Sequence, residues 1–363
     1  MPRPIHALID LSALKHNLCI VRKHTQNARI MAVIKANAYG HGLLSTAHAL
    51  RAADAFAVLE LDAAVRLREA GVYQPILLLE GFFSAADLTV IKQYHLSTVI
   101  HHQEQLAMLS TAKQKNKINV FLKINTGMNR LGFAPEQGLA VLETLRVNSL
   151  ISQITLMTHF ACADDPFQKD EVNQQLNDFF TVFRKHYLPC SLANSAAILR
   201  YPETHADWVR PGIMLYGASP LIDKTAAELG LRPVMTVSSK IIAIQHLTTR
   251  DKVGYGGQFQ TEQPMRIGVV ACGYADGYPR HAPTGTPVLV NGQRTRIVGR
   301  ISMDMLTVDL TKIQNANIGS PVILWGNELP IEEVAKSAGT ISYELFCALS
   351  SRVKTLTVTN ENQ

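Results

Sequence analysis

The feature that most constrains the fold is a regular alternation of short apolar runs with helix-like segments in the first part of the chain. Short apolar runs between turn residues predict buried strands, and apolar residues three or four positions apart predict helices. The predicted strands are 30–35, 55–59, 76–79, 97–100, 120–124, 154–159, 191–193 and 213–217. The predicted helices are 43–53, 62–70, 85–93, 103–116, 135–146, 170–186 and 196–200. About eight such units in about 220 residues fit a closed (β/α)8 barrel better than a doubly wound sheet, the competing arrangement.

The pattern changes after residue 231. Strand-like segments separated by Gly, Asn and Pro follow at 234–247, 266–271, 287–290, 295–298, 306–310, 320–325 and 353–358, with helical patterns only at 331–338 and 343–349. Asn291-Gly292 lies between two of these segments and predicts a hairpin. We therefore expect two domains: a TIM-type (β/α)8 barrel at 1–231 and a C-terminal, mostly β domain at 232–363. The first roughly eight residues could pair with the β domain instead of the barrel.

Composition excludes several classes of function. The formal net charge is +6, and the lysines and arginines are scattered, which argues against nucleic-acid binding. The five cysteines are widely spaced without a Cys-x-x-Cys pair, so neither a zinc site nor a disulfide framework is predicted. No run approaches membrane-spanning length, and the N-terminus lacks the apolar core of a signal peptide. We expect a cytoplasmic protein that uses no metal.

Polar side chains stand at the ends of several predicted barrel strands, where barrels place their chemistry. These residues are Lys35, Lys123, His159, Asn194, Ser195 and Arg210. Together they predict a cationic, partly dry pocket for an anionic ligand. Ser195 could begin a helix and bind a phosphate group, and Gly212 could let backbone amides approach it. A desolvated lysine has a lowered pKa and can form a Schiff base, although Lys35 alone could equally extend to water.

A set of motifs then identifies a family. They are AVIKANAYGHG (32–42), KINTGMNRLG (123–132), THFA (158–161), Asn194-Ser195, RPGIMLYG (210–217), VGYG (253–256), GYADGYPR (273–280), GRISMD (299–304) and TISYE (340–344). In this order, over nearly the whole chain, they resemble the alanine racemases, which are pyridoxal-phosphate enzymes with an α/β barrel and a C-terminal β domain. Agreement in all of the motifs is highly specific.

The resemblance implies a two-base interconversion of L-alanine and D-alanine, for bacterial cell wall metabolism. Lys35 is expected to hold pyridoxal 5'-phosphate and to act as acid or base on one face of the substrate Cα. Tyr255, from the partner subunit of a homodimer, is expected to serve the other face. A tyrosine of pKa about 10 is a poor base at neutral pH, so we expect His159 and Arg210 to act as cations that stabilise its phenolate.

The resemblance also assigns three basic residues. Arg210 should face the pyridine nitrogen of the cofactor. Because a guanidinium does not give up its proton, the ring should stay largely unprotonated, which limits side reactions that need a long-lived carbanion. Arg130 should contact the substrate carboxylate or the phenolic oxygen of the cofactor. Lys123 matches a lysine that is carbamylated in many relatives, where it positions the arginine.

Further contacts are implied by position. The expected cofactor contacts are Tyr39, His159, Asn194, Ser195, Gly212, Ile213 and Tyr343. Met303 and Tyr274 of the partner subunit should shape the substrate pocket. Asn125 and Ser302 stand where some relatives carry Asp and Cys.

Other interpretations stay open. The site tyrosines could be packed core residues, Met303 could be core filling, and His159 could be a hydrogen-bonded core histidine. A racemase for another small amino acid such as serine would share the motifs. A non-catalytic pyridoxal-phosphate carrier would share Lys35 but lack the second domain with Tyr255. Arg210 argues against a basic amino-acid decarboxylase, and the phosphate-contact residues argue against a Schiff-base aldolase without cofactor.

Overall fold

Eight parallel strands close into a barrel in this computed structural model, which describes residues 3–25, 27–111 and 117–359. The barrel strands, in order around the ring, are β2 (Arg29–Val33), β3 (Ala55–Val58), β4 (Ile76–Leu78), β5 (Ser97–Ile100), β6 (Ile118–Lys123), β7 (Ile151–Met157), β8 (Cys190–Asn194) and β9 (Trp208–Arg210). The ring closes where β2 pairs with β9, with Ile30 opposite Val209. The prediction of a (β/α)8 barrel is confirmed.

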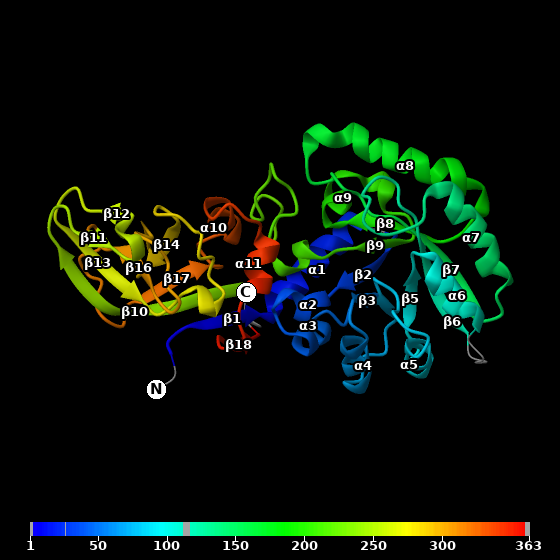
Figure 1. Cartoon of the computed structure of the whole chain (residues 1–363), viewed down its shortest axis with the longest axis horizontal. Coiled ribbons are helices and arrows are strands. Elements are labelled where there is room, and N and C mark those ends of the chain that lie inside the picture. The colour runs from blue at the N-terminus through cyan, green and yellow to red at the C-terminus, as the bar shows by residue number, and fades with distance from the viewer. Residues whose placement is uncertain (1–2, 26, 112–116, 360–363) are drawn as a thin grey trace.

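Helices connect and surround the strands (Figure 1). They are α1 (Leu11–Thr25), α2 (Lys35–Tyr39), α3 (Leu43–Ala49), α4 (Leu61–Glu69), α5 (Asp87–Gln93), α6 (Gln103–Thr111), α7 (Pro135–Val147), α8 (Lys169–Phe183) and α9 (Ser195–Arg200). Short 3-10 turns add η1 (Pro166–Gln168), η2 (Arg184–His186), η3 (Pro202–Thr204) and η4 (Ile213–Tyr216). In α8, Val172, Phe179 and Phe183 are buried, as the spacing of its apolar residues requires. The predicted helix at 103–116 corresponds to α6, and its last five predicted residues, 112–116, lie outside the described residues.

Two predictions about the barrel strands were wrong. The apolar run at 213–217 is not the eighth strand, because it forms η4, and the eighth strand is the three-residue β9. Pro211 and Gly212 separate the two segments, and proline lacks the N–H that a continuing strand would use. The first barrel strand also ends earlier than expected, at Val33 instead of Lys35.

A second sheet forms the C-terminal β domain, which confirms that part of the fold prediction (Figure 1). Its strands are β10 (Met235–Leu247), β13 (Met265–Val270), β14 (Pro287–Val290), β15 (Gln293–Arg296), β16 (Leu306–Asp309), β17 (Pro321–Trp325) and β18 (Lys354–Val358), joined by β1 (His6–Asp10). A separate ribbon pairs β11 (Lys252–Val253) with β12 (Phe259–Gln260), and η5 (Tyr255–Gly257), η6 (Tyr274–Asp276), α10 (Ile331–Ser337) and α11 (Ser342–Ala348) complete the domain.

The long strand β10 organises this sheet. It pairs with β13 and β17, and also with β1, which precedes the whole barrel in the chain. On its other side β1 pairs in parallel with β18. The predicted hairpin is present, because β14 and β15 flank Asn291 and Gly292, which both have positive φ.

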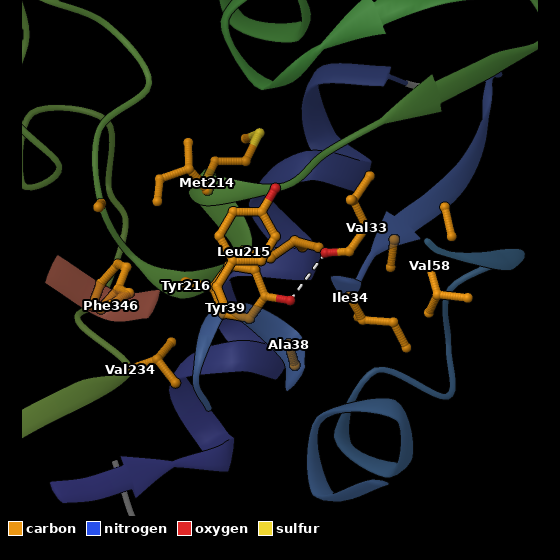
Figure 2. Packing of buried hydrophobic residues seen from close by; sticks show 14 of the residues in the cluster. Val33, Ile34, Ala38, Tyr39, Val58, Met214, Leu215, Tyr216, Val234 and Phe346 are labelled. Atoms are coloured by element: carbon orange, nitrogen blue, oxygen red, sulfur yellow. Dashed lines mark hydrogen bonds between the residues drawn. The ribbon is translucent and has the colours of Figure 1, made fainter. Parts of the chain in front are cut away.

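A buried cluster joins the barrel to α11 (Figure 2). Tyr39 stacks on Tyr216 with ring centroids 4.6 Å apart, and the Tyr216 hydroxyl donates to the Val33 carbonyl at 3.0 Å. Phe346 of α11 belongs to the same cluster. Its carbonyl lies so close to Gly40 that a Cβ on Gly40 would approach it to 2.3 Å. This contact fixes α11 against the mouth of the barrel. Among the described residues, every helix is too short or too polar to cross a membrane.

Candidate active site

The predicted strand-end residues gather at one end of the barrel, because the carboxyl ends of parallel barrel strands share one face. Lys35 comes two residues after β2, Lys123 ends β6, and His159 comes two residues after β7. Asn194 and Arg210 end β8 and β9. The prediction that these side chains form one cationic group therefore agrees with the topology of the barrel.

Lys35 stands at the start of an unusual turn. The segment α2 is not right-handed, because Ala36, Asn37 and Ala38 all have φ and ψ near +50°. Burial lowers the pKa of the Lys35 amine, and the nearby charge of Arg130 lowers it further. Both effects disfavour the ammonium form. Lys35 is therefore suited to act as a free amine nearer neutral pH than an ordinary lysine.

Arg210 is buried and bound on several sides. Its guanidinium donates to the Ser191 hydroxyl at 2.8 Å, to the Thr158 carbonyl at 2.7 Å and to Nδ1 of His159 at 3.2 Å. Burial lowers the pKa of Arg210 to about 10, so the group still carries its charge at neutral pH. Ser191 was not among the predicted residues, since a serine inside a strand gives no signal of its own.

His159 does not carry the positive charge that we expected. Burial and the charges of Arg210 and Lys123 place the pKa of His159 well below its ordinary value. Because an arginine only donates, Nδ1 of His159 must accept from Arg210, and the proton of the neutral ring lies on Nε2. A cationic role for His159 is therefore wrong, and the ring is instead a hydrogen-bond donor through Nε2.

Lys123 and Arg130 line one small pocket together with Thr158 and His159. Burial, followed by the charges of Arg210 and Arg130, lowers the pKa of Lys123 to about 8. Arg130 lies in the loop after β6, which Asn125 shapes by accepting from the N–H of Asn129 at 2.9 Å. The amine of Lys123 is therefore partly uncharged at neutral pH.

A cradle of hydroxyl groups lies at the same end of the barrel. Ser195 begins α9, and its hydroxyl accepts from the N–H of Gly212 at 2.8 Å. A Cβ on Gly212 would lie 2.6 Å from the Tyr39 hydroxyl, so only glycine fits there. The rings of Tyr39 and Tyr343 are 6.0 Å apart. Burial raises the pKa of both tyrosines, which keeps their hydroxyls protonated as donors.

The remaining predicted cofactor residues frame this cradle. The side chain of Asn194 accepts from the N–H of Ala197 and so caps α9. Ile213 is fully buried at the start of η4. Hydroxyl donors around a backbone that tolerates no Cβ suit a small oxyanion such as a phosphate group. The cradle therefore fits the phosphate-bearing cofactor that the sequence predicted.

Three other predicted residues lie on the β domain. Tyr255 is 71% exposed, Met303 is 53% exposed and Tyr274 is 38% exposed. Tyr274 and Met303 belong to adjoining loops, since the N–H of Ala275 donates to the Met303 carbonyl at 2.9 Å. Tyr255 comes between β11 and β12 in the chain. Figure 1 shows these two strands at the end of the β domain away from the barrel. Within one chain, the ribbon that carries Tyr255 is therefore remote from Lys35.

Glu80 is an acidic residue of the barrel mouth that the sequence analysis missed. Its charge raises the pKa of both Lys35 and Lys123, against the larger effects of burial and neighbouring cations. Glu80 comes two residues after β4, as Lys35 comes two residues after β2. The strand-end signal used for the lysine would have found it.

A reactive lysine and a phosphate-type cradle at the mouth of a (β/α)8 barrel with a C-terminal β domain define a class of barrel enzyme. Comparison with known proteins narrows the class. Residues 9–220 match the family model of the alanine racemase N-terminal domain, and residues 234–357 match that of the alanine racemase C-terminal domain. The chain belongs to the alanine racemase family.

Individual relatives are similar to this chain over nearly their whole lengths. An alanine racemase of Nitrosomonas eutropha is 67% identical over 99% of this chain and 100% of the relative. The crystal structure of a biosynthetic alanine racemase from Pseudomonas aeruginosa has a TM-score of 0.96 and 44% identity, covering 98% of this chain and 99% of that one. The alanine racemase structure from Acinetobacter baumannii has a TM-score of 0.92 and 41% identity, covering 98% and 100%.

Proposed function

We propose that this protein interconverts L-alanine and D-alanine by a two-base mechanism, with pyridoxal 5'-phosphate bound at the mouth of the barrel. The observation that carries the proposal is the position of Lys35, whose pKa is lowered, beside a cradle suited to a phosphate group. The names of full-length relatives at 67% identity support alanine as the substrate.

The cofactor would be held at two places. The amine of Lys35 would bind its aldehyde carbon covalently. The hydroxyls of Tyr39, Ser195 and Tyr343, with the backbone at Gly212 and Ile213, would hold its phosphate group. When bound, this cofactor withdraws electrons from the substrate Cα and so makes its proton acidic.

Racemisation needs one proton donor or acceptor on each face of Cα. Lys35 would serve one face by holding or releasing a proton at its amine. Tyr255 of the partner subunit serves the other face. His159 supports this tyrosine as a neutral donor, because Arg210 occupies Nδ1 and leaves the Nε2 proton available.

Arg210 limits the reaction to proton exchange. Its bonds to Ser191 and Thr158 orient the guanidinium, which would face the pyridine nitrogen of the bound cofactor. With a pKa of about 10, the guanidinium keeps its own proton at neutral pH and would leave the ring largely unprotonated. An acidic partner would protonate the ring and strengthen the electron withdrawal that side reactions need.

Arg130 binds the substrate carboxylate or the phenolic oxygen of the cofactor, and Lys123 positions it. With a pKa of about 8, Lys123 has a nucleophilic fraction at neutral pH. Its nitrogen can form a bond to the carbon of CO2 and release a proton, which gives a carbamate anion. That anion would pair with Arg130, whereas an ammonium would repel it.

The active enzyme is a cytoplasmic homodimer. In this arrangement the chain up to residue 231, apart from β1, forms the cofactor-binding barrel. The chain from residue 232 onward, joined by β1, forms the domain that reaches the partner's site. Tyr255, Met303 and Tyr274 are exposed on that domain, so they are free to contact a second copy. Met303 and Tyr274 of the partner subunit shape the pocket around the substrate.

Lys35→Ala tests the proposal most directly. The variant should lose the visible absorbance of bound cofactor and more than about 10⁴-fold in kcat/KM, because it removes both the covalent anchor and one base. The assay follows the decay of the circular dichroism of L-alanine or D-alanine to zero at an equal mixture. Undiminished absorbance in the variant contradicts the assignment of Lys35. A stable dichroism signal with wild-type protein contradicts alanine as substrate, and serine is then the next amino acid to test.

A further inference from the structure

A strained stretch of backbone carries the residues that the proposed function places on the cofactor. Residues 36–39 have φ between 51° and 55° in an unbroken series, and none of them is glycine. L-amino acids avoid this left-handed region, because Cβ then approaches the following carbonyl oxygen. Such a turn persists only where neighbouring groups hold it.

Backbone hydrogen bonds hold part of the turn. The N–H of Gly40 donates to the Ala36 carbonyl at 3.0 Å, and that of Gly42 donates to the Asn37 carbonyl at 3.0 Å. The Asn37 side chain accepts from the N–H of Leu43 at 2.9 Å and so ties the turn to α3. The Ala38 carbonyl accepts from the backbone N–H of His41 at 3.0 Å, and the carbonyls of Ala38 and Tyr39 both also lie within reach of the His41 imidazole.

His41 is 1% exposed and has one ring nitrogen in use. Its Nδ1 lies 2.8 Å from the Tyr39 carbonyl and 3.1 Å from the Ala38 carbonyl. Because carbonyls only accept, Nδ1 must carry a proton. Burial lowers the pKa of His41 to about 4, so the ring is neutral and Nε2 has no proton.

The other side of the ring makes only apolar contacts. Nε2 is buried and has no hydrogen-bond partner in the described part of the chain. The imidazole packs against Tyr216 and Phe346, each with ring centroids 4.7 Å away. Tyr39 stacks on the same Tyr216 ring (Figure 2). An aromatic hydrocarbon would fill this space without leaving Nε2 unpaired, so packing does not account for a histidine.

We propose that His41 is a positioning residue. The single N–H of its imidazole ring, shared between the Ala38 and Tyr39 carbonyls, helps to hold the left-handed turn that places Lys35 and Tyr39. The turn has Lys35 before it and Tyr39 at its end, so its shape sets the spacing between the covalent anchor and a phosphate-binding hydroxyl. This inference rests on the proposed roles of those two residues.

His41→Phe separates hydrogen bonding from packing, because it keeps an aromatic ring and removes the donor. The dissociation constant of pyridoxal 5'-phosphate should rise about tenfold, the effect of one lost buried hydrogen bond. In the cofactor-free protein, amide hydrogen exchange at Gly40 and Gly42 should become faster, since the turn opens more often. His41→Asn returns an N–H near the position of Nδ1 and should recover part of both effects.

A second substitution tests the left-handed turn itself. Glycine adopts positive φ without the steric penalty, so Ala36→Gly in the His41→Phe protein should restore most of the cofactor affinity. Ala140→Gly, at an exposed position of the right-handed helix α7, is the matched control and should restore none. Wild-type affinity in His41→Phe, or a defect that Ala36→Gly leaves unchanged, would overturn the role of His41.

If His41→Phe does not fold, nitrogen NMR of histidine-labelled holoenzyme gives the answer. The expected spectrum shows His41 protonated at Nδ1 and unprotonated at Nε2 at neutral pH. A proton on Nε2 would overturn the inference. These results are independent of the Lys35→Ala experiment: undiminished visible absorbance of bound cofactor in Lys35→Ala contradicts the proposed role of Lys35, whereas a wrong His41 tautomer contradicts only the role of His41.

Discussion

The predicted site residues lie in two regions, the barrel mouth and the β domain. The two regions differ in how much of each side chain is buried by the rest of its own chain. At the barrel mouth, Tyr39, Ser195 and Arg210 are 7%, 4% and 5% exposed, and hydrogen bonds fix the last two. On the β domain, Tyr255 and Met303 are 71% and 53% exposed. The first region is a finished binding site, whereas the second presents side chains that contact little within their own chain.

Several basic side chains gather at the barrel mouth. Burial, and after it the charges of neighbouring cations, lower the pKa values of Lys35, Lys123 and His159. An anionic cofactor and a substrate carboxylate would relieve that repulsion. Under the proposed function the two regions would have different tasks: the barrel would bind cofactor and substrate, and the β domain of a second copy would supply the proton donor or acceptor on the opposite face of Cα.

Tyr255→Phe should have the largest effect on the β-domain side. Losing the phenolic proton donor should lower kcat about 10³-fold in both directions, while cofactor absorbance stays unchanged. Tyr73→Phe, at another tyrosine that is 84% exposed, is the matched control and should leave kcat unchanged. Steady-state kinetics with each alanine enantiomer measure the effect, and near-normal turnover would remove the two-base account.

Mixed dimers test whether the two regions meet across subunits. A dimer of one Lys35→Ala chain and one Tyr255→Phe chain should contain one intact site and one site with both changes. It should therefore regain about half of the wild-type activity, although each parent homodimer is nearly inactive. Differently tagged, co-expressed chains allow the hybrid to be purified. A hybrid as inactive as its parents would place both residues in the site of one chain.

Lys123→Met should give the smallest loss of activity, about tenfold in kcat/KM, and it should stabilise the cofactor-free fold. The folded pKa of about 8 is below the value of an unfolded lysine, so the unfolded state binds more protons between these values. Stability of the wild type therefore rises with pH above about 8, and the native ammonium is unfavourable below it. At pH 7, in buffer free of CO2 so that no carbamate forms, the variant should gain roughly 3 kcal/mol in free energy of unfolding.

This gain should shrink as the pH rises toward 10, because the wild-type lysine is then neutral in the folded state. Urea unfolding at several pH values measures it. Lys117→Met, at an exposed lysine just before β6, is the control and should change stability little at any pH. A variant less stable than wild type at pH 7 would contradict the repulsion inferred at the barrel mouth.

Sequence alone predicted most of the barrel, because seven of its strands are apolar runs of useful length between turn residues. It failed at β9, where Trp208, Val209 and Arg210 are too few to form a pattern and end in a charge. The run at 213–217 is more apolar and therefore gave the stronger strand signal. A single sequence cannot distinguish a buried 3-10 turn from a buried strand by hydrophobicity.

The motifs located the site residues, but not the physical state of two of them. The residues around Lys35 favour ordinary right-handed or extended backbone, whereas the structure has a left-handed turn that packs against distant groups. His41 contacts Tyr216 and Phe346, and Gly40 lies against the Phe346 carbonyl. The charge of His159 likewise depends on Arg210, which lies 51 positions away in the chain. Both are consequences of tertiary contacts that local propensity does not contain.

The pairing of β1 with β10 and β18 also matters during synthesis. Residues 6–10 leave the ribosome early, yet their parallel partner at residues 354–358 follows almost the whole chain later. At about 5 to 20 residues per second, that delay is about 20 to 70 s. The barrel strands at 29–210 can pair during this interval, whereas β1 has to wait with Ala7 and Ile9 uncovered. Cofactor capture by the barrel could thus begin before the β domain that completes the partner's site has formed.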